Sequence, residues 1–212
     1  MENLILCQGS LHSITKKTQA KKLRLAVCDI DSRNLDKISD VQILDLSAHL
    51  LNLSNINDLI EFPNLYDLNL SATGIKKIDP LHKIKNLAKL NLSYNSFLSS
   101  EWQCLVDLNS LQELNLGYTN IYNHDLDFAA NMSKLTHLYL GYTSISSSGV
   151  EKLQECSQLQ KLEMPHTNLC DESINFFTQM LNLKTLNVYS SKMSPEGIES
   201  LRNKMPWCYI YG

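Results

Sequence analysis

Apolar residues recur along this chain with a period of 24 residues. Segment 111–121 has apolar residues at its first, fourth, sixth and eleventh places, and segments 135–145 and 159–169 repeat this pattern. A constant period in this range predicts a stack of similar coils rather than a single folded core with a cleft. The first place of the unit falls, at intervals of 24 residues with one interval of 22, at Val41, Leu65, Leu87, Leu111, Leu135, Leu159 and Leu183.

The first half of each unit predicts a short strand. Its apolar residues lie two apart, as at Leu114 and Leu116, and this spacing indicates a strand with one buried face. No single unit can bury its leucines alone, so stacked units must share a leucine column and form a parallel sheet along one side. The apolar eleventh place is expected to turn inward after the corner, at Ile75, Phe97, Ile121, Ile145 and Leu169.

The second half of most units predicts a short helix. Residues 148–151 have a capping-box pattern, Ser194 and Pro195 are typical of a helix start, and Asp171 is expected to cap the helix that follows it. The 22-residue unit is different, because Pro80 and the shorter length leave little room. A 3₁₀ connection is therefore predicted there.

The unit resembles the leucine-rich repeat, Leu-x-x-Leu-x-Leu-x-x-Asn/Cys-x-Leu over about 20–29 residues. This resemblance implies an α/β leucine-rich-repeat solenoid that is curved, with a parallel β-sheet on the concave face and short helices and 3₁₀ turns on the convex face. The chain departs from the pattern at the ninth place, where a hydroxyl is expected to bond the backbone of a neighbouring turn in place of Asn. The ninth places are Thr73, Thr119, Thr143 and Thr167, with Asn95, Ser191 and His49.

Particular subtypes of the repeat are also recognisable. Segments 145–153 and 193–201 resemble the GALA and cysteine-containing subtypes, which occur in ubiquitin-ligase substrate receptors and in bacterial effectors. The 22-residue unit resembles the subtype of phosphatase regulatory subunits. These resemblances, with an Asn, Lys, Ser and Ile bias typical of AT-rich genomes, imply a bacterial effector that acts on a host protein. An intracellular adaptor or regulatory subunit is the alternative.

One domain with three parts is expected, because no Pro-, Gly- or Ser-rich linker interrupts the repeats. Residues 1–40 are interpreted as an N-terminal cap with a degenerate repeat, in which 4–6 and 22–27 predict strands and Leu35 and Ile38 a helix. Residues 41–206 form seven repeats, and residues 207–212 form a C-terminal capping strand.

Composition and charge limit the classes of partner expected for this chain. Apolar residues make up 43% of the chain, charged residues 19%, and the net charge is −3, so no basic face for nucleic acid is expected. The basic cluster at 16–24 is interpreted as a solvated edge, with an acidic membrane or nucleic acid as the alternative. Apolar runs are too short for a membrane span, and no secretory signal is visible. A cytoplasmic protein is expected, or one translocated into a host cytoplasm.

No catalytic, metal or cofactor site is predicted. The six cysteines form no Cys-x-x-Cys motif, and buried reduced thiols are expected at Cys104, Cys156 and Cys170, which favours a reducing compartment. Glu113 and His137 occupy equal places on adjacent strands, but an open sheet supplies no pocket and no nucleophile. The chain is therefore expected to be a non-enzymatic, monomeric module that binds a partner protein.

Aromatic residues recur at the eighth place of the unit, on one lip of the concave surface. Exposed tyrosines are over-represented at interfaces, so this ladder is hypothesised to anchor the partner. The alternative is that the rings stack and stabilise only the sheet. The partner-binding candidates are the ladder and its neighbours: Tyr94, Tyr118, Tyr142, His166, Tyr139, Glu113, His137, Glu163 and Tyr189.

Two further ladders are expected on the same surface. Asn69, Asn91 and Asn115 share the fifth place, where mutual side-chain hydrogen bonding is favoured over peptide recognition. The third place alternates in charge, which predicts weak ion pairs between neighbouring strands. The charged third places are Asp67, Lys89, Glu113 and Lys161.

Overall fold

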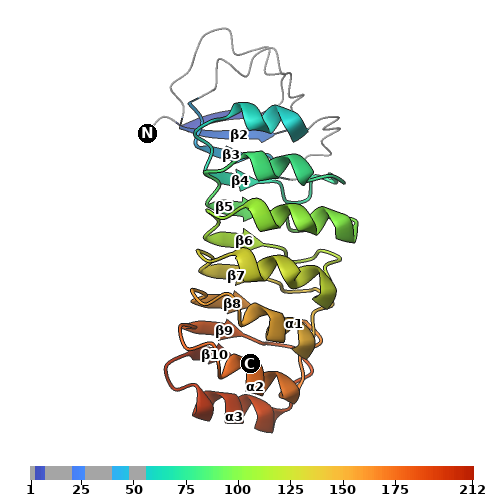
Figure 1. The fold of residues 1–212 in the computed structure, drawn as a ribbon, viewed down its shortest axis with the longest axis vertical. Helices are drawn as coiled ribbons and strands as arrows, with labels where there is room; N and C mark the ends of the chain where they lie inside the picture. Colours follow the sequence, from blue (N-terminus) through green and yellow to red (C-terminus); the bar gives the residue numbers. More distant parts are fainter. Residues whose placement is uncertain (1–2, 8–20, 27–39, 48–55) are drawn as a thin grey trace.

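The chain forms an elongated stack of coils in which each coil contributes one strand to a single parallel sheet (Figure 1). The computed structural model describes residues 3–7, 21–26, 40–47 and 56–212. Within them ten strands lie in chain order from β1 to β10, which is the order expected when every unit repeats the same turn. The strands are β1 (Asn3–Cys7), β2 (Lys22–Ala26), β3 (Ile43–Asp45), β4 (Asp67–Asn69), β5 (Lys89–Asn91), β6 (Glu113–Asn115), β7 (His137–Tyr139), β8 (Lys161–Glu163), β9 (Thr185–Asn187) and β10 (Tyr209–Tyr211).

The strand register aligns equivalent leucines in one row. Leu114 lies opposite Leu90 on one side and Leu138 on the other, and each leucine is buried. The eleventh-place residues are buried too, as predicted, so each coil is sealed against the next on both sides of its corner. This confirms the leucine column and the parallel sheet expected from the 24-residue period.

The ninth-place threonines donate to the backbone of their own coil, not to that of a neighbouring turn as expected, and Thr73 Oγ1 in addition lies 3.3 Å from Asn95 Oδ1 in the next coil. Thr119 Oγ1 donates to the carbonyl oxygen of Leu116 at 2.7 Å, and Thr143 Oγ1 donates to that of Leu140 at 2.6 Å. Asn95 behaves differently, because its Nδ2 donates to carbonyl oxygens in its own coil and in the preceding one. A hydroxyl has only one proton to donate, so threonine satisfies only its own corner.

The outer side of the stack carries 3₁₀ helices in the first coils and α-helices in the last ones (Figure 1). The 3₁₀ turn predicted around Pro80 is confirmed, and 3₁₀ geometry extends to the coils on either side of it. The 3₁₀ helices are η3 (Ile56–Glu61), η4 (Asp79–Lys83), η5 (Ser99–Asp107), η6 (Asn123–Asn131) and η7 (Asp171–Ser173), and the α-helices are α1 (Ser147–Leu153), α2 (Ile174–Phe177) and α3 (Pro195–Lys204).

Of the three predicted helix starts, one is confirmed and two are wrong. Ser194 caps α3, because its Oγ accepts the Gly197 N–H at 2.9 Å and Pro195 follows it. Helix α1 begins one residue before the predicted capping box, and its N-cap Ser146 makes no side-chain cap. Asp171 does not cap the helix after it, because its carboxylate accepts the backbone N–H and the hydroxyl of Ser194 in the next coil, at 2.9 and 2.6 Å.

The contact between Asp171 and Ser194 predicts that the stability of the fold decreases at acid pH. The two Ser194 hydrogen bonds lower the pKa of Asp171 below its usual 3.8. A lowered folded-state pKa gives stability that is present above about pH 4 and is lost as the pH falls through that pKa. We expect Asp171→Asn to have a lower denaturant midpoint than wild type at pH 6, and this difference to shrink as the pH falls through the lowered pKa of Asp171. Ser194→Ala, which keeps the carboxylate but removes the hydroxyl donor, should flatten the same pH region, and an unchanged profile would contradict the assignment.

Several predictions fall near the N-terminus. Strands β1 and β2 confirm the two strands expected at 4–6 and 22–27. The helix expected at Leu35 and Ile38, and the ninth-place His49, lie outside the described residues.

Two of the three thiols expected to be buried are buried. Burial raises the pKa of Cys104 and of Cys156 to about 12, whereas Cys170 is only partly buried.

Candidate interaction surface

The eighth place of every described repeat adopts a left-handed backbone conformation. From Ala72 to Ser190 the six eighth-place residues have φ between 54° and 59°. This conformation turns the chain away from the sheet after the strand, and it costs a residue other than glycine about 1–3 kcal/mol. Bulky residues are rare there, yet three tyrosines and a histidine occupy the middle four positions: Tyr94, Tyr118, Tyr142 and His166.

These four rings form one continuous stack, which we call the aromatic ladder. The ring centroids of Tyr94 and Tyr118 are 4.2 Å apart, those of Tyr118 and Tyr142 are 4.1 Å apart, and those of Tyr142 and His166 are 4.2 Å apart. Interplanar angles of 12°, 13° and 22° show that the rings lie face to face. Most ring faces are therefore covered by other rings, and the ladder presents ring edges and hydroxyl groups to solvent.

The ladder remains exposed despite its stacking. The exposed fraction is 56% for Tyr94, which ends the stack beside Ala72, and 42% and 43% for Tyr118 and Tyr142. At the other end, Tyr189 packs edge-on against His166 at 6.0 Å between centroids. The adjacent hydroxyl of Tyr142, as a hydrogen-bonding neighbour, raises the pKa of Tyr118. The ladder is thus a preformed surface.

A shallow groove of 360 Å³ runs along the foot of the ladder. One wall is the three tyrosines, and the other includes Tyr139 and Glu163. Its floor consists of the small seventh-place residues, among them Gly117 and Gly141. A Cβ atom on Gly141 would lie 2.9 Å from the Pro165 ring, so glycine is required by close packing. The hydrophobic pattern does not reveal these floor residues, although the repeated Gly-Tyr-Thr string is a visible signal.

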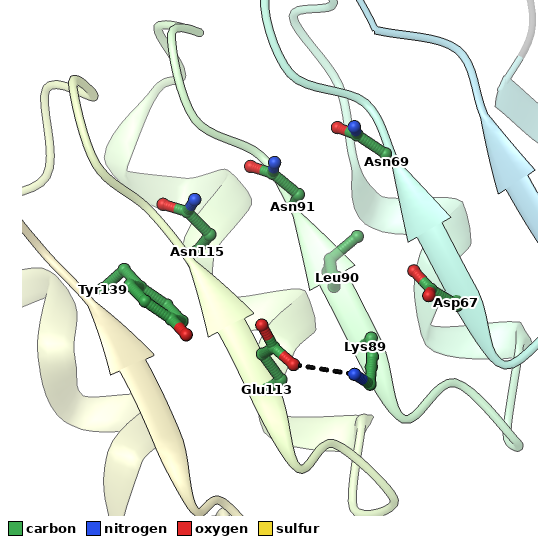
Figure 2. Close-up of a pocket in the computed structure, with 8 residues that line it drawn as sticks. All are labelled: Asp67, Asn69, Lys89, Leu90, Asn91, Glu113, Asn115 and Tyr139. Atoms are coloured by element: carbon green, nitrogen blue, oxygen red, sulfur yellow. Dashed lines mark ion pairs between the residues drawn. The ribbon is translucent and has the colours of Figure 1, made fainter. Parts of the chain in front are cut away.

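A second, more polar hollow of 240 Å³ adjoins this groove and shares Asn115 and Tyr139 with it (Figure 2). The Lys89 ammonium lies 3.0 Å from the Glu113 carboxylate, which confirms an ion pair between adjacent third places. Hydrogen bonding to Glu113 raises the pKa of Lys89, whereas burial raises the pKa of Asp67 at the end of the hollow. Strands β4 to β7 supply these side chains from one face of the sheet.

The asparagines of this hollow do not bond to one another, so the predicted mutual ladder is wrong. Each amide oxygen accepts the backbone N–H two residues further on, at 3.0 Å, as in an Asx turn. Asp45 makes the same contact with Ser47. Among the described residues, the Nδ2 groups of Asn69, Asn91 and Asn115 donate to no protein acceptor, and Figure 2 shows the three amides in one row across neighbouring strands.

The remaining candidate residues lie on the next strands. The Lys161 ammonium lies 3.2 Å from Glu163 and 5.1 Å from the centre of the Tyr139 ring, and Asn187 Nδ2 donates to Glu163 at 2.7 Å. Burial is the main cause of the raised pKa of Tyr139. Glu163 is therefore satisfied within the protein, and Tyr139 forms part of a packed wall.

The geometry does not assemble acid–base chemistry on the sheet. Glu113 pairs with Lys89, while His137 Nδ1 contacts the hydroxyl of Thr136 at 2.9 Å, so the two candidate groups face different partners. Over the described stretches, no three His, Cys, Asp or Glu side chains gather to hold a metal ion.

A serine, a histidine and an aspartate do meet on the outer side. Ser99 Oγ and Asp125 Oδ1 each lie 3.4 Å from His124 Nε2. A hydrolytic triad needs the carboxylate on one ring nitrogen and the hydroxyl on the other, whereas here both oxygens address the same atom. Asp125 instead accepts the Tyr122 N–H at 2.8 Å and caps η6.

Comparison with protein families gave two matches, both described as leucine-rich repeat, over residues 63–121 and 131–153. Comparison with curated protein sequences gave no match. Among solved structures, the chain resembles an internalin (InlF) from Listeria monocytogenes, with a TM-score of 0.68 and 21% identity over 91% of this chain and 60% of that one. It also resembles internalin C2 from the same species (TM-score 0.66, 22% identity, 89% and 77% coverage) and a leucine-rich-repeat protein of Leptospira interrogans (TM-score 0.64, 20% identity, 91% and 55% coverage).

A parallel sheet built from one strand per coil, with short helices behind it, defines a solenoid repeat protein whose fold presents an extended surface for other proteins. The repeat pattern, the family matches over residues 63–121 and 131–153 and the fold shared with the similar solved structures support a leucine-rich-repeat protein. The chain spans 60% of the first similar structure. No helix among the described residues has the length and apolar character needed to cross a membrane.

Proposed function

We propose that this protein binds a partner protein through its concave sheet face, with Tyr94, Tyr118, Tyr142 and His166 as the anchoring residues. The supporting observation is that large aromatic residues occupy left-handed backbone positions where glycine or asparagine would be less strained. Stacking offsets part of this cost, but it does not account for rings that remain 42–56% exposed. Exposed, stiff tyrosines provide contact area at a low cost in side-chain entropy.

The surface around the ladder suits this role. The groove is partly apolar and lies beside the polar hollow. The two share Asn115 and Tyr139, so one segment of the partner can occupy both. Glu113, His137, Tyr139, Glu163 and Tyr189 border this area and are proposed as contacts of lesser energy. Most of the binding energy is expected from the few aromatic anchors, as is usual in protein interfaces.

The biological setting that we propose is a bacterial effector that is translocated into the cytoplasm of a host cell and acts on a host protein there; a chain that is not an effector would act in the cytoplasm of the cell that produces it. The resemblance of segments 145–153 and 193–201 to effector repeats supports it, and the three similar structures are bacterial proteins. An intracellular adaptor or regulatory subunit is the second candidate, which the 22-residue unit favours. A translocation assay separates them, because only an effector is delivered into a second cell.

Removing the outermost ring of the ladder tests the proposed surface. Tyr94 has one stacked neighbour and the largest exposed fraction of the ladder tyrosines, so Tyr94→Ala removes contact area at a small cost in stability. For a partner captured and identified with the wild-type chain, we expect the dissociation constant to rise about tenfold or more. Tyr122→Ala is the matched control, because Tyr122 is 47% exposed and precedes η6 on the other side of the coil. Equal effects of the two substitutions would contradict the assignment.

A further inference from the structure

We infer that the segment recognised by this face is a proline-rich chain in the polyproline II conformation, lying along the solenoid axis across strands β4 to β7. This inference rests on the proposed function and specifies the chemistry of the partner. The proline-rich segment would accept hydrogen bonds from Asn69 and Asn115 and place its rings in the groove beneath the aromatic ladder.

The first argument is the surplus of hydrogen-bond donors. The oxygens of Asn69, Asn91 and Asn115 are occupied by backbone N–H groups, so each amide offers its two N–H protons outward. The tyrosine hydroxyls of the ladder can add further donors. A proline-rich chain has carbonyl acceptors at every residue and lacks N–H donors at each proline, which makes it complementary to this face.

The second argument is charge. Lys89 is paired with Glu113, and Lys161 with Glu163, so the cations beside the hollow and the groove are already neutralised. A face whose lysines are already paired gains little from an anionic partner. A neutral, carbonyl-rich chain can dock without breaking either pair.

The third argument is the spacing of the amides. Neighbouring strands lie about 4.8 Å apart, so Asn69 and Asn115, two strands apart, are separated by about 9.6 Å. A polyproline II helix has three residues per turn and rises about 3.1 Å per residue, so carbonyls on one face recur every ~9.3 Å. A β-strand repeats its facing carbonyls every ~6.6 Å, which matches neither one nor two strand spacings. The amide row therefore favours polyproline II over an extended strand.

The groove provides the remaining complementarity. Its tyrosine wall, with glycine and proline along its floor, is apolar enough for proline rings, and it adjoins the amide row at Asn115. Proline-rich segments dock in aromatic-lined grooves because their conformation is preformed and little entropy is lost on binding. The closed stack of rings leaves no gaps for long side chains, which also suits compact prolines.

The test uses an acetylated and amidated decaproline peptide titrated into the isotope-labelled chain. We expect saturable shifts of the side-chain amide resonances of Asn69 and Asn115, with smaller shifts for Asn91. A Gly-Ser decapeptide and an alternating Thr-Val decapeptide serve as flexible and strand-forming comparison probes. Both should bind more weakly than decaproline.

The chain itself provides the matched variant. Asp45 makes the same Asx contact as the asparagines, so Asn69→Asp with Asn115→Asp keeps the turns but removes the donors. We expect this double variant to bind decaproline about 5- to 150-fold more weakly, as two lost hydrogen bonds imply. Asn91→Asp should have a smaller effect. The neutral Asn69→Ala with Asn115→Ala separates loss of donors from added charge, and thermal unfolding checks that each variant folds.

Three results would overturn the inference: no saturable amide shifts with decaproline, equal or tighter binding of the Thr-Val peptide, or unchanged affinity in both double variants. Failure of the inference is distinguishable from failure of the proposed function. If decaproline does not bind but Tyr94→Ala still weakens the captured partner, the interaction surface stands and only the chemistry of the partner is wrong. If Tyr94→Ala leaves that partner unaffected, the proposed surface itself is wrong.

Discussion

Replacing Leu138 by alanine is expected to lower the free energy of unfolding by about 2–5 kcal/mol. Leu138 is fully buried on β7 and lies in register with Leu114 and Leu162, so it contacts the coils on both sides. Truncation leaves a cavity that the flanking coils cannot fill, because each is held in place by its own neighbour. Leu116, equally buried two residues after Leu114, should behave in the same way.

Denaturant titration of the purified chain measures this loss. Leu98→Ala is the matched control, since it removes the same atoms from a side chain that is 73% exposed. The control should change the free energy of unfolding by no more than about 0.5 kcal/mol. Similar values for the two substitutions would refute the sealed column.

The combined change Tyr118→Ala and Tyr142→Ala is expected to lower both the free energy of unfolding and the affinity for the partner. The loss of binding free energy should be the larger of the two. It removes three stacked contacts, each worth about 0.5–1.5 kcal/mol, and the lower end applies because the rings are half exposed. A loss of about 1.5 kcal/mol in the free energy of unfolding follows. Two anchoring residues of an interface together contribute more than about 2 kcal/mol, so partner affinity should fall at least ~30-fold.

The backbone of this variant needs no rearrangement. Ala72 already occupies the eighth place with φ of 55°, so alanine fits the left-handed position in this repeat. Thermal unfolding and a binding isotherm, measured on the same samples, separate the two effects. Reduced stability with unaltered partner affinity would show that the ladder only stabilises the sheet.

The fold could be predicted from the sequence because the apolar residues that determine it recur at a constant interval. Each unit repeats the same apolar places, so the parallel sheet, its register and the buried column were predictable from spacing alone. The Pro80 connection was predictable because proline restricts the backbone locally. The two wrong helix caps share one reason: Asp171 and Ser148 bond to residues in adjacent coils, at Ser194 and Asn123, and a local pattern contains no information on such contacts.

The candidate surface was only partly predictable. The aromatic ladder and the ion pair of Lys89 and Glu113 could be predicted, because residues at the same place of successive repeats lie side by side on neighbouring strands. The left-handed backbone at Tyr118 and the groove over Gly141 could not be read from hydrophobic pattern, since they depend on how the corner turns. The prediction of hydrogen bonds between the asparagines was wrong because each side-chain oxygen can instead accept a backbone N–H within its own coil. This local Asx turn forms in place of a bond between strands.

The self-contained corners have a consequence for how such a chain changes over generations. Because Thr119 and Thr143 satisfy their hydroxyls inside their own coil, excising one whole 24-residue cassette, such as 111–134, leaves the ninth-place threonines of the remaining coils with their acceptors. Among the described residues, only the backbone N–H groups of Phe97 and Ser146 lose side-chain acceptors in that cassette, at Asn120 and Asn123. Removing the cassette that holds Asn95 would instead strand partners in the coil before it. Unequal recombination is therefore tolerated best among the threonine-bearing cassettes, where near-identical Gly-Tyr-Thr strings are found, and each such event would lengthen or shorten the tyrosine row by one ring.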